Sequence, residues 1–108
     1  MTFMYTTYLD KEQLKRELAA ALADDASVEK VVVFGSFNNS DEPHDMDIAV
    51  FSTSTADYLT QALAYRRKLR GIARIIPLDV LPISLPCDPD APFFGEINKG
   101  ETVYEKRH

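Results

Sequence analysis

Leucines recur at a helical spacing in the first part of the chain. From Asp10 onward, Leu14, Leu18 and Leu22 stand four residues apart with charged residues between them. This spacing predicts an amphipathic helix with one apolar face. Asp10 can cap the helix, because Gln13 follows it at the spacing of a capping box.

Two strands are predicted after this helix. Residues 30–34 (KVVVF) form a short β-branched run that ends at Gly35, which is typical of a strand buried on both faces. The polar residues 38–44 (NNSDEPH) include a proline and predict a loop. Residues 45–51 (DMDIAVF) then predict a second strand, which begins with two acidic residues.

A second helix and a third strand are expected next. Ser54 or Thr55 can cap the helix, which stops at Gly71. Its inward-facing residues are expected to be Leu59, Ala62, Leu63 and Leu69. The third strand is predicted over residues 74–80, and it need not be parallel to the others.

The rest of the chain predicts one short helix and one extended piece. Four prolines make residues 81–92 (LPISLPCDPDAP) mostly irregular, whereas residues 93–100 (FFGEINKG) suggest a short helix and residues 101–106 (ETVYEK) a final strand. This element order predicts an α/β (α+β) fold with a small mixed sheet flanked by helices. At 108 residues, the chain (1–108) is expected to be a single domain.

Composition narrows the class of protein. Apolar residues make up 45% and charged residues 27%, as in an ordinary globular protein. No run approaches the roughly 20 apolar residues of a membrane span, and the first ten residues lack a secretory pattern, so we expect a cytoplasmic protein without a membrane partner. The net charge of -5 disfavours binding to a nucleic-acid backbone.

Two segments leave their partners open. The basic run of Arg66, Arg67, Lys68, Arg70 and Arg74 is interpreted first as a solvated helix end, then as a protein-partner patch, and last as a nucleic-acid surface. The aromatic N-terminus (Phe3, Met4, Tyr5 and Tyr8) packs either on the core or on another subunit. A homo-oligomer and a hetero-oligomer therefore both remain open.

Three aspartates and a Gly-Ser pair are the candidate residues of a functional site. Side chains alternate along a strand, so Asp45 and Asp47 project from the same face and share one small volume. Such a pair is relieved by a proton or by a hard cation such as Mg²⁺. Asp79 lies in an otherwise apolar strand, where an acid needs a partner or a metal. Gly35 and Ser36 end a buried strand, where exposed N–H groups can hold phosphate.

These residues resemble those of a known superfamily. Val33 to Ser36 (VFGS), the Asp45-Met46-Asp47 motif nine residues on and Asp79 in a later strand are similar to the nucleotidyltransferases of the DNA polymerase beta superfamily. The closest likeness is the minimal nucleotidyltransferase (MNT) branch, with its MntA-like antitoxins. Ile97, Gly100 and Tyr104 are similar to that branch's closing helix, glycine turn and aromatic strand residue.

The resemblance implies a polymerase-beta-like fold and an enzyme that uses Mg²⁺ and ATP. Asp45 and Asp47 would hold two Mg²⁺ ions, and Gly35 and Ser36 would bind the triphosphate. Asp79 would hold the catalytic ion and help deprotonate the attacking hydroxyl. A two-metal site of this kind suits in-line attack on the α-phosphorus.

A domain this small has little spare chain for an acceptor pocket, so we expect the acceptor to be a protein that docks. The MNT branch suggests a HEPN-domain toxin, whose tyrosine hydroxyl would receive AMP. The alternative is a catalytically degenerate module that neutralises or scaffolds its partner by contact alone. It is favoured by Asn38, Asn39 and Ser40, where the family usually has a small residue, a basic residue and a glycine.

Overall fold

The computed structural model describes residues 10–92 and 94–107, so the aromatic N-terminal segment lies outside the described residues. Within them, the chain forms a four-stranded sheet, four α-helices and one 3-10 helix. In chain order these elements are α1 (Lys11–Ala23), β1 (Val28–Phe34), the 3-10 helix η2 (Gly35–Asn38), β2 (Met46–Ser52), α2 (Tyr58–Lys68), α3 (Arg70–Ala73), β3 (Leu78–Ser84), α4 (Phe94–Asn98) and β4 (Glu101–Glu105).

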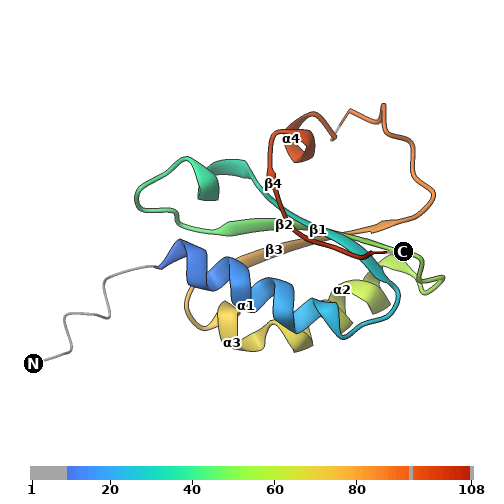
Figure 1. The fold of residues 1–108 in the computed structure, drawn as a ribbon, viewed down its shortest axis with the longest axis horizontal. Helices are drawn as coiled ribbons and strands as arrows, with labels where there is room; N and C mark the ends of the chain where they lie inside the picture. The colour runs from blue at the N-terminus through green and yellow to red at the C-terminus, as the bar shows by residue number, and fades with distance from the viewer. Residues whose placement is uncertain (1–9, 93, 108) are drawn as a thin grey trace, which may run out of the picture.

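The sheet is mixed, with strand order β3-β2-β1-β4. Strand β1 is antiparallel to β2 and β4, whereas β2 is parallel to β3. Helices α1, α2 and α3 lie on one face of the sheet and α4 on the other (Figure 1). The expected small mixed sheet flanked by helices is therefore confirmed, and its two central strands are β1 and β2.

The larger core lies between the sheet and helices α1 to α3. The predicted apolar face of α1 is confirmed, since Leu14, Leu18 and Leu22 are all buried there. The Asp10 carboxylate caps this helix by accepting a hydrogen bond from the Gln13 backbone N–H at 3.1 Å. The sheet contributes alternate residues of its strands to this core, among them Val31, Val33, Met46, Ile48, Val50 and Val80.

A smaller core covers the opposite face of the sheet. Phe94 and Ile97 of α4 pack there against β-strand residues that include Val32 and Phe51. Gly100 lets the chain between α4 and β4 pass close to β1, because a Cβ at this position would lie 2.5 Å from the Val33 carbonyl oxygen. Strand β1 is thus covered on both faces, as its β-branched run predicts.

Helix α2 differs from its prediction in both its cap and its orientation. Asp57, rather than Ser54 or Thr55, caps it by accepting a hydrogen bond from the Thr60 N–H at 2.8 Å. Leu59 and Leu63, which were expected to face inward, point outward and are 64% and 52% exposed. Ala62 and, just beyond the helix, Leu69 are buried as predicted, and Gln61 and Tyr65 complete the buried face.

The third strand begins later than predicted. Helix α2 ends at Lys68, and α3 continues the helical path through Gly71, so residues 74–77 connect a helix to a strand. Strand β3 then runs through Pro82, which the prediction left irregular. A proline is tolerated because β3 is an edge strand, where a missing N–H breaks no ladder on the open side. No helix among the described residues is both long and apolar enough to cross a membrane.

Candidate active site

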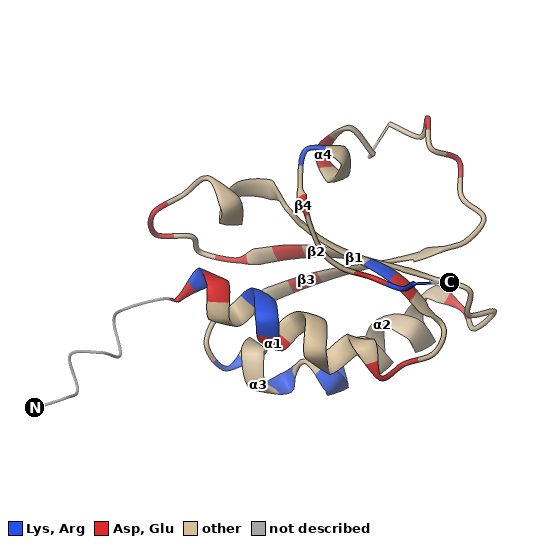
Figure 2. Cartoon of the chain, viewed as in Figure 1, with Lys and Arg blue, Asp and Glu red and all other residues tan. Residues whose placement is uncertain are grey.

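Three aspartates meet at one end of the sheet. Asp45, Asp47 and Asp79 each offer a carboxylate oxygen, and these oxygens all lie within 4.8 Å of one another. The parallel register places Asp47 directly beside Asp79, and the Met46 N–H donates to the Pro77 carbonyl at 2.9 Å, which brings Asp45 to the start of β3. The acidic positions on β2 and β3 are visible in Figure 2.

The strand alternation explains why these side chains are not buried in the main core. Met46, Ile48 and Val50 point into the core beneath the helices, whereas Ala49, which shares the face of Asp47, packs on the α4 side. The expectation that Asp45 and Asp47 project away from Met46 and Ile48 is therefore confirmed. The triad faces the less covered side of the sheet.

Crowding of the carboxylates changes the ionisation of Asp47. Partial burial, then the charges of Asp45 and Asp79 and a hydrogen bond with the Asp79 carboxyl, raise the pKa of Asp47 above its ordinary value. A raised pKa means that the folded state binds this proton more tightly than the unfolded state. The free site is therefore stabilised by a proton at low pH and loses that contribution as the pH rises through the pKa of Asp47.

The same three carboxylates fit a divalent cation. Mg²⁺ takes oxygen ligands at about 2.0–2.1 Å, so two oxygens on opposite sides of one ion lie about 4.2 Å apart. The spread of up to 4.8 Å among the three aspartates is close to this value. A cation there would also relieve the repulsion that holds the proton on Asp47.

Gly35 closes the site from the side of β1. It has a φ of 75°, in the left-handed region that favours glycine, and it directly follows Phe34, which pairs with Asp47. A Cβ on Gly35 would lie only 2.4 Å from Oδ2 of Asp47. The backbone at Gly35 therefore lies so close to Asp47 that no side chain fits between them.

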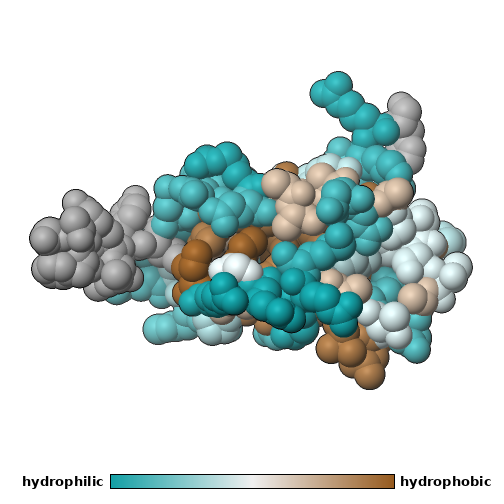
Figure 3. Space-filling model, turned by 90° about the horizontal axis from the view of Figure 1, so that it is seen from below, coloured by the Kyte–Doolittle hydropathy of each residue, from teal (hydrophilic) through white to brown (hydrophobic). Residues whose placement is uncertain are grey.

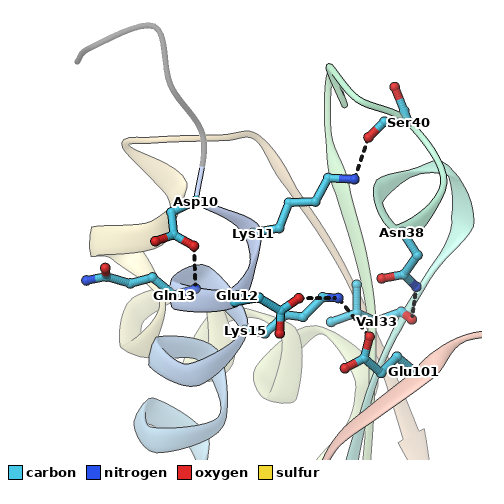
Figure 4. Close-up of polar contacts among 9 residues, drawn as sticks. All are labelled: Asp10, Lys11, Glu12, Gln13, Lys15, Val33, Asn38, Ser40 and Glu101. Carbon is cyan, nitrogen blue, oxygen red and sulfur yellow. Dashed lines mark hydrogen bonds and ion pairs between the residues drawn. The ribbon is translucent and has the colours of Figure 1, made fainter.

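The turn after Gly35 is helical. Residues Gly35–Asn38 form η2, and Ser36 is exposed at its start. The Ser36 carbonyl accepts the N–H groups of Asn39 at 3.1 Å and Ser40 at 2.9 Å. Asn38 fastens the turn to β1 by donating from Nδ2 to the Val33 carbonyl at 2.9 Å (Figure 4).

Two lysines of α1 hold this turn, and the sequence patterns did not single them out. Lys11 donates to the Ser40 carbonyl (Figure 4). Its Nζ lies 5.4 Å from the centre of the Phe37 ring. Lys15 is buried beneath the same ring and pairs with Glu101 at 2.7 Å. These contacts join residues far apart in the sequence, so only the fold brings them to the site.

Comparison with known proteins agrees with this geometry. A family model described as "Polymerase beta, Nucleotidyltransferase" matches residues 16–108. Among curated protein sequences, none matches this chain.

Solved structures with a similar fold include two toxin–antitoxin complexes. One contains a tri-AMPylated Shewanella oneidensis HEPN toxin with its MNT antitoxin; the similarity has a TM-score of 0.66 at 14% identity and covers 90% of this chain and 74% of that one. The other is the toxin-antitoxin MntA-HepT, with a TM-score of 0.62 at 13% identity and coverage of 88% and 73%. Because the family model matches residues 16–108, which is most of this chain, the chain belongs to the polymerase beta nucleotidyltransferase family.

Proposed function

We propose that this protein transfers AMP from Mg-ATP to a hydroxyl group of a partner protein. The observation that carries the proposal is the convergence of Asp45, Asp47 and Asp79 within 4.8 Å, in contact range of the Gly35 backbone. Family membership supports a nucleotide as the substrate. The choice of ATP is supported by the AMPylated toxin in the structurally similar complex.

In this proposal each residue has a defined role. Asp45 and Asp47 would hold two Mg²⁺ ions and Asp79 one of them; when bound, the ions supply charge neutralisation for the triphosphate and the departing pyrophosphate. The backbone at Gly35 and the hydroxyl of Ser36 would bind and orient the phosphates.

The transfer step balances without any further reactant. The acceptor oxygen forms a bond to the α-phosphorus, and the bond from that phosphorus to the bridging oxygen breaks, so pyrophosphate leaves. The proton of the acceptor hydroxyl would pass to the Asp79 carboxylate, which is exposed and therefore open to an incoming group.

We propose further that the acceptor is a HEPN-domain protein, which would make this chain the antitoxin of a toxin–antitoxin pair. Two solved structures of similar fold are complexes of MNT-type antitoxins with such toxins. The cytoplasmic location expected from the sequence belongs to this proposal.

Radiolabelled ATP tests the proposal directly. Candidate HEPN-domain proteins from the same genome are incubated with the chain, Mg²⁺ and ATP labelled on the α-phosphate, and label on the candidate is measured. Asp79→Asn should lower the rate by about 10²- to 10⁴-fold, because the proton acceptor is lost. Asp41→Asn serves as the matched control, since Asp41 is an exposed acid in the loop before the triad. Equal rates in both variants would contradict the assignment.

A catalytically degenerate binding module is the second candidate. It is favoured by Asn39, which occupies the position where the family usually has a basic residue beside the phosphates. The two candidates differ in an Asp45→Asn plus Asp47→Asn double variant. If that variant still forms the complex and still neutralises the toxin, the module acts by contact alone; if neutralisation is lost while the complex forms, transfer is required.

A further inference from the structure

The outer surface of α2 and α3 combines exposed leucines with arginines. Tyr58, Leu59, Leu63 and Ile75 are the large apolar side chains that stand more than half exposed within the described residues, and all four lie between positions 58 and 75. The same segment carries four of the six arginines of the chain. Figure 3, which views the helix side, shows strongly hydrophobic atoms projecting at the edge of a largely polar surface.

Helical spacing places these residues in one row. Leu59, Leu63, Arg66 and Arg70 follow one another at intervals of four, three and four residues, so they share one face of the helical path. The hydrogen bonds from the Leu69, Ala73 and Arg74 N–H groups to carbonyls four residues earlier carry that path from α2 into α3. We call the row formed by Leu59, Leu63, Arg66, Arg67, Arg70 and Arg74 the α2 row.

The arginines of the α2 row have no ionic partners within the described residues. Lys68, which lies off the row, is paired with Asp24 at 2.9 Å, but none of the four arginines forms an ion pair there. The chain as a whole carries a net charge of -5, whereas this surface is positively charged (Figure 2). Two exposed leucines thus lie next to four arginines that have no ionic partner within the described residues.

We propose that the α2 row is the docking surface for an amphipathic helix of the partner protein, with leucine-like residues over Leu59 and Leu63 and carboxylates facing the arginines. Charge complementarity selects an acidic helix, and the two leucines require an apolar stripe on it. Residues 59 to 74 span about 22 Å at 1.5 Å per residue, which is the length of roughly four helical turns.

The position of the α2 row suits the proposed transfer. This role rests on the proposed function, because it assumes that the docked protein is also the acceptor. Helix α2 lies on the face of the sheet opposite the triad and packs against β3, the edge strand that carries Asp79. The row runs back from the far end of the sheet toward the end where Asp79 begins β3, as Figure 1 shows. A helix held there would leave adjoining parts of its protein free to reach around the edge strand.

Two other occupants fit the surface less well. A nucleic-acid backbone would satisfy the arginines but would leave Leu59 and Leu63 uncovered, and the net charge of the chain opposes it. In a symmetric pair of copies, the arginines would meet no carboxylate of the other row, because the row itself contains no acidic residue.

A charge-swap experiment tests the docking surface with defined probes. The probes are two stapled helical peptides with leucines at positions i and i+4, one flanked by glutamates and the other by lysines, and binding to the full chain is measured by fluorescence anisotropy. Leu59→Ser plus Leu63→Ser should lower the affinity for the acidic peptide by about tenfold or more. Arg66→Glu plus Arg70→Glu should reverse the preference toward the lysine peptide, which a misfolded variant would not do.

Several results would overturn the proposal. One is equal binding of the acidic peptide to the wild type and to both variants. Another is a dimer, seen by sedimentation, that becomes monomeric in Leu59→Ser plus Leu63→Ser. The third is binding of single-stranded RNA that is tighter than binding of the acidic peptide and is abolished in the arginine variant. Asp47→Asn should leave peptide binding unchanged, and the arginine variant should keep its response to Mg-ATP. Failure of docking and failure of transfer are therefore distinguishable.

Discussion

At the residue scale, the site depends on how closely Gly35 approaches Asp47. The glycine supplies a φ of 75°, and the space that a Cβ would need is taken by the Asp47 carboxylate. Any larger residue at this position must therefore displace an acid of the triad. The backbone turn and the carboxylates thus form one structural unit, which the proposed binding of Mg-ATP would use as a whole.

We predict that Gly35→Ala damages the site more than the fold. The left-handed φ should cost about 1–2 kcal/mol of stability for alanine, and the Cβ should push the Asp47 carboxylate out of the triad. Urea unfolding with and without Mg²⁺ measures both effects, and the stabilisation by Mg²⁺ should disappear.

Gly71→Ala is the matched control for this prediction. A Cβ on Gly71 meets nothing within 4 Å, so alanine in α3 should leave stability unchanged or raise it by up to about 1 kcal/mol. If Gly35→Ala kept a wild-type response to Mg²⁺, the close approach of Gly35 would have no role in the site.

Much of this site could be predicted from the sequence because it depends on local geometry. Side-chain alternation places Asp45 and Asp47 together, and a glycine at a strand end marks the turn. That Asp79 joins them also needs the parallel pairing of β2 with β3, which the fold supplies. Lys11 could not be predicted, since it contacts Ser40 across 29 positions of the chain.

At the element scale, a buried polar cluster fixes how α2 sits on the sheet. Gln61 is 4% exposed, and its Nε2 donates to the Ala56 carbonyl at 2.6 Å and to Ser84 Oγ at 3.2 Å. Its Oε1 accepts from Ser52 Oγ at 3.2 Å. One side chain thus ties α2 to the ends of β2 and β3, and this attachment turns Leu59 and Leu63 to the surface.

Replacing Gln61 by alanine should destabilise the protein by about 2 kcal/mol, because buried partners lose their hydrogen bonds. Urea unfolding followed by circular dichroism measures the change. Leu63→Ala in the same helix is the control and should stay within about 0.5 kcal/mol, since Leu63 is half exposed. A larger loss for Leu63 than for Gln61 would mean that α2 is oriented as the leucine spacing first suggested.

The sequence predicts the element types, but the cap and buried face of α2 and the bounds of β3 differ from the prediction. Leucines at helical spacing predict a buried face, whereas the hydrogen bonds of the buried polar Gln61 decide the orientation of α2. Prolines predict an irregular chain, whereas the edge position of β3 accommodates Pro82. Both errors arise where tertiary contacts outweigh local preference.

At the scale of the whole molecule, the proposed transfer site and the proposed docking surface lie on opposite sides of the sheet. The triad and the Gly-Ser turn lie toward the α4 side, whereas the α2 row lies on the outer surface of the helical layer. Transfer and docking can therefore be altered separately by mutation. The single-domain organisation of residues 1–108 stays a prediction.

The central claim is that the three aspartates and the Gly35 turn bind Mg-ATP, and thermal melts of the purified chain test it most directly. Melts are recorded with Mg²⁺, ATP, both and neither, for the wild type and Asp47→Asn. A ligand at a hundred times its Kd stabilises by about 2.7 kcal/mol, which is a shift on the order of 10 °C for a domain of this size. We predict a shift that requires Mg²⁺ and ATP together and is absent in Asp47→Asn. No shift at millimolar ATP, or an equal shift in Asp47→Asn, would contradict the claim.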